Sequence, residues 1–308
     1  MISRLLAFLL VPIGLGSTLA NDAAINDGAT GPEPVGWRAG AESIIQMKSE
    51  NLDIHFGLDT SKVHATFRFV SHKKSGGATQ KLGFPDYSRS EREGSVMGPI
   101  TNMVTKVNGK VVPSELSEGY YREKISDDGS IQYEKAEKPK PDPNVIPEVR
   151  RFAWHIIEVK FPPGEEVVVE RIYETPSGIS AGGESFMLYE TRTGGAWRGE
   201  IEKLTAEVTL DAAIDPGLIV LEPREGWEIS EDKRTLSLEW NNFEPRTDND
   251  RQYFTVTTLD TRKFEQRHKD FPEEYPSLEK FISDWKDLYK KIARRAEEEK
   301  EKQKNEAK

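Results

Sequence analysis

The sequence has 308 residues, of which 43 are Lys or Arg, 53 are Asp or Glu and none is Cys, and its formal net charge is −10 at pH 7. The acidic balance argues against a nucleic-acid partner, because phosphate binding relies on clustered cations. The absence of cysteine excludes disulfides, thiolate metal sites and cysteine nucleophiles. The length suits one or two domains.

Residues 1–20 are typical of a secretory signal peptide. Arg4 precedes the apolar run Leu5–Gly16, and Thr18-Leu19-Ala20 forms a small-x-small cleavage site. The run is too short for a hydrocarbon core of ~30 Å, which needs about 20 helical residues. We therefore expect cleavage before Asn21, a mature chain without a transmembrane segment, and export to the periplasm or the exterior. An uncleaved membrane anchor is the alternative.

The mature chain begins with a change of pattern. Residues 21–40 are rich in Ala, Gly, Pro and Asp and predict a flexible leader. Residues 41–136 form a first β region, in which apolar and polar side chains alternate over 63–70. Within it, the pair Asn108-Gly109 is typical of a type I′ hairpin turn.

Prolines interrupt the β pattern at two places. Pro85 is expected to end a short strand, because proline cannot donate to a sheet ladder. The Pro-rich segment 137–149 predicts a linker or a long crossover. A second β region, 150–262, follows it with short strands separated by turn residues. The fold class is therefore all-β: an antiparallel β-sandwich, either one large or two consecutive, with a C-terminal amphipathic α-helix.

The C-terminal segment 263–296 is predicted to be helical. Ser277 is a suitable N-cap, and the following apolar residues recur at helical spacing: Leu278, Phe281, Ile282, Trp285, Leu288, Tyr289 and Ile292. So apolar a stripe needs a packing partner, either the chain's own β body, which we favour, or the same helix of a second chain. The charged tail 297–308 carries no apolar face and is expected to be disordered.

Candidate metal ligands are few. His55, His64 and His72 flank one predicted hairpin and could meet around Zn²⁺ or Cu²⁺, but their spacing matches no known ligand pattern. The acidic turn 248–250 could offer oxygens to Ca²⁺, but it lacks the glycine and the distal glutamate of a calcium loop. We expect neither a metal nor a cofactor.

Charged side chains allow two further interpretations. A facing pair of carboxylates would permit glycoside hydrolysis, but the sequence does not nominate a pair among its 53 acids. A basic cluster on the last helix could contact an anionic membrane or partner, or could be a solvated face paired with Glu297–Glu299. Its members are Lys290, Lys291, Arg294 and Arg295.

Three segments together resemble a family of exported bacterial proteins known as domain of unknown function 4424, over about residues 40–259. They are 45–54 with the strand 63–70, then 83–85 with 107–110, and then 189–201. The last is the most specific, and its Tyr189, Gly194, Trp197 and Gly199 form a possible structural motif. The resemblance implies export and a β-rich fold, and it supplies no catalytic residues.

These observations favour a non-enzymatic periplasmic or secreted β-sandwich that acts as a binding or structural module. Its partner would be an envelope protein or a ligand. Two alternatives remain at this point. One is a carbohydrate-active hydrolase with an unidentified carboxylate pair, and the other is an envelope assembly protein that acts through the C-terminal helix.

Overall fold

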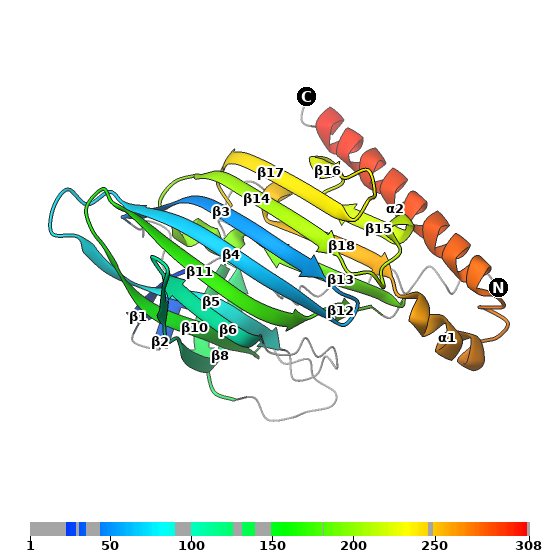
Figure 1. Cartoon of the computed structure of the whole chain (residues 1–308), viewed down its shortest axis with the longest axis horizontal. Coiled ribbons are helices and arrows are strands. Elements are labelled where there is room, and N and C mark those ends of the chain that lie inside the picture. The colour runs from blue at the N-terminus through cyan, green and yellow to red at the C-terminus, as the bar shows by residue number, and fades with distance from the viewer. Residues whose placement is uncertain are drawn as a thin grey trace.

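Strands dominate the computed structural model, which describes residues 23–28, 31–34, 44–89, 100–125, 131–138, 149–180, 182–245 and 249–306. Three sheets and a long C-terminal helix, α2 (Leu278–Glu306), make up the molecule (Figure 1). The predicted all-β class with a C-terminal helix is confirmed. The predicted signal peptide 1–20 lies outside the described residues.

The largest sheet has eight strands in the order β16-β17-β14-β3-β4-β11-β6-β7. Its neighbours pair antiparallel except for β14 and β3, which are parallel. In the β6–β7 hairpin, Asn108 and Gly109 have φ values of 49° and 75°, as a type I′ turn requires. The strands are β3 (Ile45–Phe56), β4 (Thr60–Ser71), β6 (Thr101–Val107), β7 (Lys110–Val112), β11 (Glu166–Pro176), β14 (Ile201–Leu210), β16 (Trp227–Ile229) and β17 (Thr235–Phe243).

Two smaller sheets complete the β body. The six-stranded sheet has the order β2-β1-β5-β10-β8-β9, and the four-stranded sheet has the order β12-β13-β18-β15. The first contains β1 (Ala23–Gly28), β2 (Gly31–Pro34), β5 (Ala78–Arg89), β8 (Glu115–Ile125), β9 (Ile131–Ala136) and β10 (Val149–Phe161). The second contains β12 (Gly178–Ile179), β13 (Glu184–Glu190), β15 (Ile219–Glu222) and β18 (Tyr253–Leu259).

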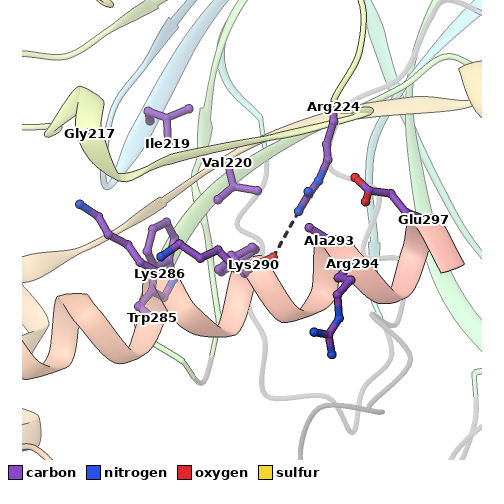
Figure 2. A pocket seen from close by; sticks show the side chains of 11 residues that line it. Gly217, Ile219, Val220, Arg224, Trp285, Lys286, Lys290, Ala293, Arg294 and Glu297 are labelled. Atoms are coloured by element: carbon purple, nitrogen blue, oxygen red, sulfur yellow. Dashed lines mark hydrogen bonds between the residues drawn. The ribbon is translucent and has the colours of Figure 1, made fainter.

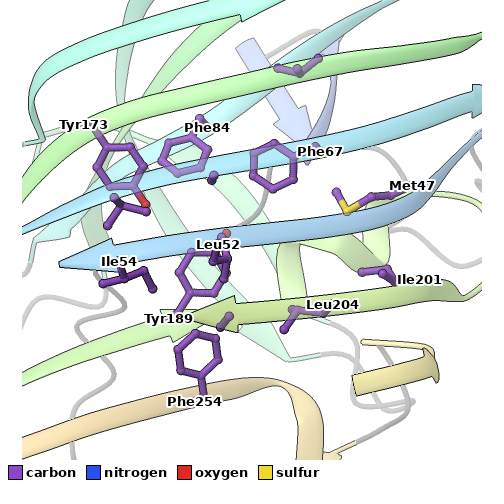
Figure 3. Packing of buried hydrophobic residues seen from close by; sticks show 14 of the residues in the cluster. Met47, Leu52, Ile54, Phe67, Phe84, Tyr173, Tyr189, Ile201, Leu204 and Phe254 are labelled. Atoms are coloured by element: carbon purple, nitrogen blue, oxygen red, sulfur yellow. The ribbon is translucent and has the colours of Figure 1, made fainter. Parts of the chain in front are cut away.

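One continuous core joins the three sheets (Figure 3). The ring of Phe84 in β5 lies 5.1 Å from that of Tyr173 in β11, centroid to centroid. Farther along the eight-stranded sheet, Trp240 of β17 packs edge-on against Phe254 of β18. The eight-stranded sheet therefore forms one layer, and the two smaller sheets pack against it as the other.

The two predicted β regions are not consecutive sandwiches. Strand β10, from the second region, pairs with β5 and β8 of the first. Strand β14, also from the second region, pairs with β3. Residues 139–148 of the expected linker lie outside the described residues, and Val149 already belongs to β10. The chain forms one large sandwich.

The sequence predicted a flexible leader over residues 21–40, and the structure corrects this prediction. It contains β1 and β2, which pair with each other, and β1 also pairs with β5, as in Ile25 opposite Lys81. The segment's small residues have weak strand propensity. Pairing with β5 gives its backbone hydrogen-bond partners, and such tertiary context outweighs local preference.

Pro85 does not end its strand. Strand β5 continues to Arg89, and its register with β10 shifts where Ala153 faces Tyr87 and Trp154 faces Pro85. This β-bulge leaves Asp86 as the extra residue. A bulge is one of the few places where a sheet tolerates proline, because the ladder is already interrupted there.

Helix α2 begins where the sequence predicted but ends later than predicted. Its start agrees with the sequence: the backbone N–H of Lys280 donates to Ser277 Oγ at 3.2 Å. The prediction that the charged tail 297–308 is disordered is also corrected, because α2 continues to Glu306 instead of ending at residue 296. Glu, Lys and Gln have high helix propensity, and i,i+4 ion pairs such as Arg294–Glu298 at 3.3 Å support the last turns.

The central part of the apolar stripe of α2 packs on the chain's own four-stranded sheet, as we expected, whereas Leu278 and Ile292 at its ends are exposed. Phe281 and Trp285 form a second buried cluster with Leu218 and Leu259. The indole Nε1 of Trp285 also donates to Glu184 Oε1 at 3.1 Å. Beyond this contact the helix extends past the β body (Figure 1). None of the described helices is long and apolar enough to cross a bilayer.

Arg262 fastens the start of the C-terminal segment to the β3–β4 turn. Its guanidinium donates to both carboxylate oxygens of Asp59, at 2.8 Å each, and to Asp260 at 2.8 and 2.9 Å. These hydrogen bonds from Arg262 hold the pKa of Asp59 below its ordinary value of 3.8. A lowered folded-state pKa stabilises the fold at higher pH, and this stabilisation is lost as pH falls through that pKa.

We expect Arg262→Gln to make the free energy of unfolding depend less on pH in the acidic range. The wild type should lose free energy of unfolding as pH falls below 3.8 and Asp59 is protonated, and the variant should lose less because its Asp59 titrates more nearly as in the unfolded chain. Urea denaturation at pH 7 and pH 3 measures the difference. Lys269→Gln, on the exposed side of α1 (Phe264–Asp270), is the control. Identical pH slopes for wild type and Arg262→Gln would contradict the assignment.

Candidate binding groove

An open groove of about 430 Å³ runs between α2 and β15 (Figure 2). It lies on the same side of the four-stranded sheet as the buried contact of Trp285. Its lining residues are Gly217, Ile219, Val220, Arg224, Trp285, Lys286, Tyr289, Lys290, Ala293, Arg294 and Glu297.

The helical wall of the groove has two rows of side chains. Lys286, Lys290 and Arg294 are spaced by four residues and form one row along α2. Because one helical turn has about 3.6 residues, side chains four residues apart lie on the same face of the helix. The second row, from Trp285 to Glu297, has the same spacing and spans roughly 18 Å at 1.5 Å per residue. The groove is therefore elongated along the helix.

The opposite wall is the edge of β15. Ile219 packs against the main core and Val220 against the helix cluster, so their side chains point to opposite faces of the sheet. Both residues nevertheless line the groove. Among the described strands, β15 pairs with β18 alone, so its other edge is open.

The groove is positively charged on an acidic protein. Four cationic side chains and the single carboxylate of Glu297 line it, whereas the whole chain has a formal net charge of −10. Arg224 Nη2 donates to the main-chain oxygen of Tyr289 at 3.2 Å (Figure 2). Within the part of the chain that the structure describes, neither Arg224 nor Lys286 has a carboxylate partner within ion-pair distance. Their charges are available to an anion.

The other two cations have only solvated partners. Lys290 Nζ lies 3.2 Å from Asp287, and Arg294 Nε lies 3.3 Å from Glu298. All four side chains of these two ion pairs are more than half exposed, and surface ion pairs of this kind contribute about 0–1 kcal/mol to stability. An anionic ligand could therefore displace them at little cost.

Tyr289 contributes an aromatic surface and not an acid or a base. Burial raises the pKa of its hydroxyl, and the nearby carboxylates of Glu184 and Glu222 raise it further. The phenol therefore keeps its proton at neutral pH. The groove offers cationic and apolar contacts together with the carboxylate of Glu297.

The predicted motif residues lie away from this groove. Tyr189 is buried in β13, where its hydroxyl donates to Glu50 of β3 across the layers. Trp197 is 1% exposed, and its ring lies 4.8 Å from that of Phe69, centroid to centroid. Both side chains connect the sheets from inside the core.

The two motif glycines shape the chain around Trp197. Gly194 belongs to a short 3₁₀ helix (Arg192–Ala196), and its carbonyl accepts the Trp197 N–H at 3.1 Å. Gly199 has a φ of 63°, a left-handed conformation in which glycine is unstrained. The motif therefore contains a 3₁₀ helix followed by a left-handed glycine.

The three histidines of the first hairpin do not converge. Each contacts a different side chain, and no group of three His, Asp or Glu side chains able to hold a metal occurs among the described residues. The pairs are His55–Asp211 at 3.3 Å, His64–Glu170 at 3.0 Å and His72–Gln46 at 2.9 Å. Asp248 of the acidic turn lies outside the described residues.

Buried carboxylates have structural roles where their contacts are known. Glu184 holds Trp285, Asp260 holds Arg262, and Asp86 accepts the Ile100 N–H at 2.5 Å. The groove itself contains one carboxylate, that of Glu297. It therefore does not provide the two facing carboxylates of a glycoside hydrolase.

The sequence found half of the groove's cations. Lys290 and Arg294 belong to the basic cluster singled out on the last helix, and their neighbours Lys291 and Arg295 are exposed but do not line the groove. Arg224 had no signal, since it stands 65 residues before its contact at Tyr289.

Comparison with known proteins defines the molecule by its fold. No family model and no curated protein matches the chain. Among solved structures, a Legionella pneumophila protein assigned provisionally to nutrient binding is 15% identical, with a TM-score of 0.56 over 82% of this chain and 74% of its own. The two proteins share a β-rich fold over most of their lengths.

Two further solved structures show weaker similarity. The M1 zinc metallopeptidase of Deinococcus radiodurans is 10% identical, with a TM-score of 0.34 over 70% of this chain and 43% of its own. Yeast LTA4 hydrolase is 7% identical, with a TM-score of 0.35 over 76% of this chain and 31% of its own. The chain spans less than half the length of either protein, and we infer no activity from them.

Proposed function

We propose that this protein is an exported, non-enzymatic binding module and that the groove between α2 and β15 is its binding site. The observation that carries the proposal is the groove itself, a cationic, elongated cavity on an otherwise acidic β-sandwich. The groove lies between α2 and β15, with Arg224 on the loop after β15, and α2 is fixed to the β body by Trp285. A site on rigid elements binds without first ordering its own side of the interface.

Three further points support the proposal. The Legionella protein with the same fold is assigned provisionally to nutrient binding. The resemblance to the exported family, which stays a prediction, implies export, as the predicted signal peptide does. The groove also combines four cationic side chains with apolar ones, which suits the binding of an anionic ligand.

Export predicts a defined N-terminus. We expect the mature protein to begin at Asn21, because Thr18-Leu19-Ala20 precedes it as a cleavage site. A cut there leaves β1, which starts at Ala23, intact. N-terminal sequencing of protein isolated from the producing cells decides the matter. A membrane-bound product that retains Met1 would overturn the proposal of export by cleavage.

Position-specific photo-crosslinking tests the binding site. A photoreactive benzoylphenylalanine replaces Lys286, whose side chain lines the groove, and in a matched control it replaces Lys291, which lies on the same helix outside the groove. Irradiation of cells that export the full-length protein should give a discrete adduct at position 286 and none at position 291. Adducts of equal yield at both positions, or at neither, would contradict the groove as the binding site.

A further inference from the structure

We propose that the groove takes an acidic segment of a partner polypeptide, which binds in an extended conformation as an added strand along β15. This inference rests on the proposed function and specifies its ligand. Two independent features of the groove carry it: the open strand edge on one wall and the spacing of the cations on the other.

The open edge provides the backbone contacts. An edge strand presents N–H and C=O groups that can pair with another chain, and peptides bind many domains by adding a strand in this way. Ile219 and Val220 of β15 line the groove, and the edge of β15 that does not face β18 pairs with no described strand. A strand paired there would be fifth in the sheet order after β12, β13, β18 and β15.

The cation row provides the side-chain contacts. Lys286, Lys290 and Arg294 are separated by four residues each, which corresponds to about 6 Å along the helix axis. In an extended strand, alternate residues point to the same face and are about 6.6 Å apart. Acidic residues at every second position of an added strand would therefore meet the three cations one by one.

The face is also determined. Val220 packs toward α2, so alternate side chains of an added strand on the same face of the sheet also point toward the helix. The acidic residues belong on that face, and the intervening residues point to the face of Ile219, which packs on the main core. A segment that alternates acidic and apolar residues satisfies both faces.

Other anionic ligands fit less well. A small anion would use one or two cations and leave the rest of the row and the strand edge without a role. An anionic membrane surface would attract the exposed Lys291 and Arg295 as strongly as the groove cations. These two cases differ from the proposal in measurable ways.

Fluorescence anisotropy with the full-length protein tests the proposal. The probe is a fluorescein-labelled peptide of three Glu-Val repeats. The comparison peptides have the same composition in blocks, Glu-Glu-Glu-Val-Val-Val, or the same alternation with alternate backbone amides N-methylated. We expect the alternating probe to bind at least tenfold more tightly than either, because the block peptide loses the spacing match and the methylated peptide loses backbone hydrogen bonds.

Charge reversal locates the site. The triple variant Lys286→Glu, Lys290→Glu, Arg294→Glu should weaken the alternating probe at least tenfold. The matched control Lys291→Glu, Arg295→Glu changes the same helix outside the groove and should leave binding unchanged. All five side chains are exposed, and circular dichroism with a thermal melt verifies that each variant remains folded.

Each contrary outcome has a distinct meaning. Equal binding of block and alternating peptides, with competition by inorganic phosphate at similar concentrations, would replace the strand by a small-anion site. Equal loss of binding in the control variant, matched by equal loss on vesicles containing anionic lipid, would replace it by a membrane surface. If no peptide binds but an adduct still forms at position 286, the strand proposal fails and the proposed function stands. If both fail, the groove is not the binding site.

Discussion

Replacement of Trp197 by alanine is expected to lower the free energy of unfolding by about 3–5 kcal/mol, the range for large aromatic truncations in a core. The indole is 1% exposed and contacts the ring of Phe69. It lies directly after the 3₁₀ helix that connects β13 toward β14, so its loss leaves a cavity where the layers meet. Truncation there removes buried apolar contacts, and water does not replace them in the core.

Urea denaturation measures the effect. Ile229→Ala is a suitable control, because Ile229 is 54% exposed at the sheet edge and its truncation should change stability by no more than about 0.5 kcal/mol. A loss under about 1 kcal/mol for Trp197→Ala, on the scale of surface substitutions, would show that the indole is not a packing residue.

Truncation of the chain after Arg262 should destabilise the β body. It removes Phe281 and Trp285, and two fully buried large side chains are together worth roughly 3–6 kcal/mol. It also uncovers Leu218 and Leu259 on the four-stranded sheet. The contact between Arg262 and Asp59 is retained, so the effect reports on the helices alone.

Three measurements follow this truncation: urea denaturation, binding of a hydrophobic dye and size-exclusion chromatography. We expect lower stability, increased dye binding and aggregation. A chain that ends at Arg295 is the matched control, because it removes only helical turns beyond the packed stripe and should be as stable as the full chain. If the chain ending at Arg262 stays fully stable and only the full-length protein dimerises, the helix is an assembly element and not part of the core.

Local features of this fold could be predicted from the sequence. The Asn108-Gly109 turn requires two positive φ values that few residue pairs allow, so a dipeptide was enough to place it. The stripe that contains Phe281 and Trp285 placed α2 in the same way, through a helical period. In each case the determining interactions lie within a few residues of each other.

Features that depend on distant partners could not be predicted. Strand β1 exists because β5 offers it an edge, and Pro85 is tolerated because β10 accommodates a bulge at Trp154. The groove has the same character. Sequence reasoning grouped Lys290 with Lys291, but successive helical residues are rotated by about 100°, so only a partner such as β15 distinguishes them.

The parallel pairing of β14 with β3 has a consequence for how the chain folds. Strand β3 begins at Ile45, and β14 begins at Ile201, so the middle of the eight-stranded sheet closes only after most of the chain is synthesised. Contacts between distant segments slow folding, because loop entropy is lost before they form. Until then β3 exposes a hydrogen-bonding edge that invites aggregation. Because strands of the two halves pair with each other, we expect neither half of the chain to fold on its own.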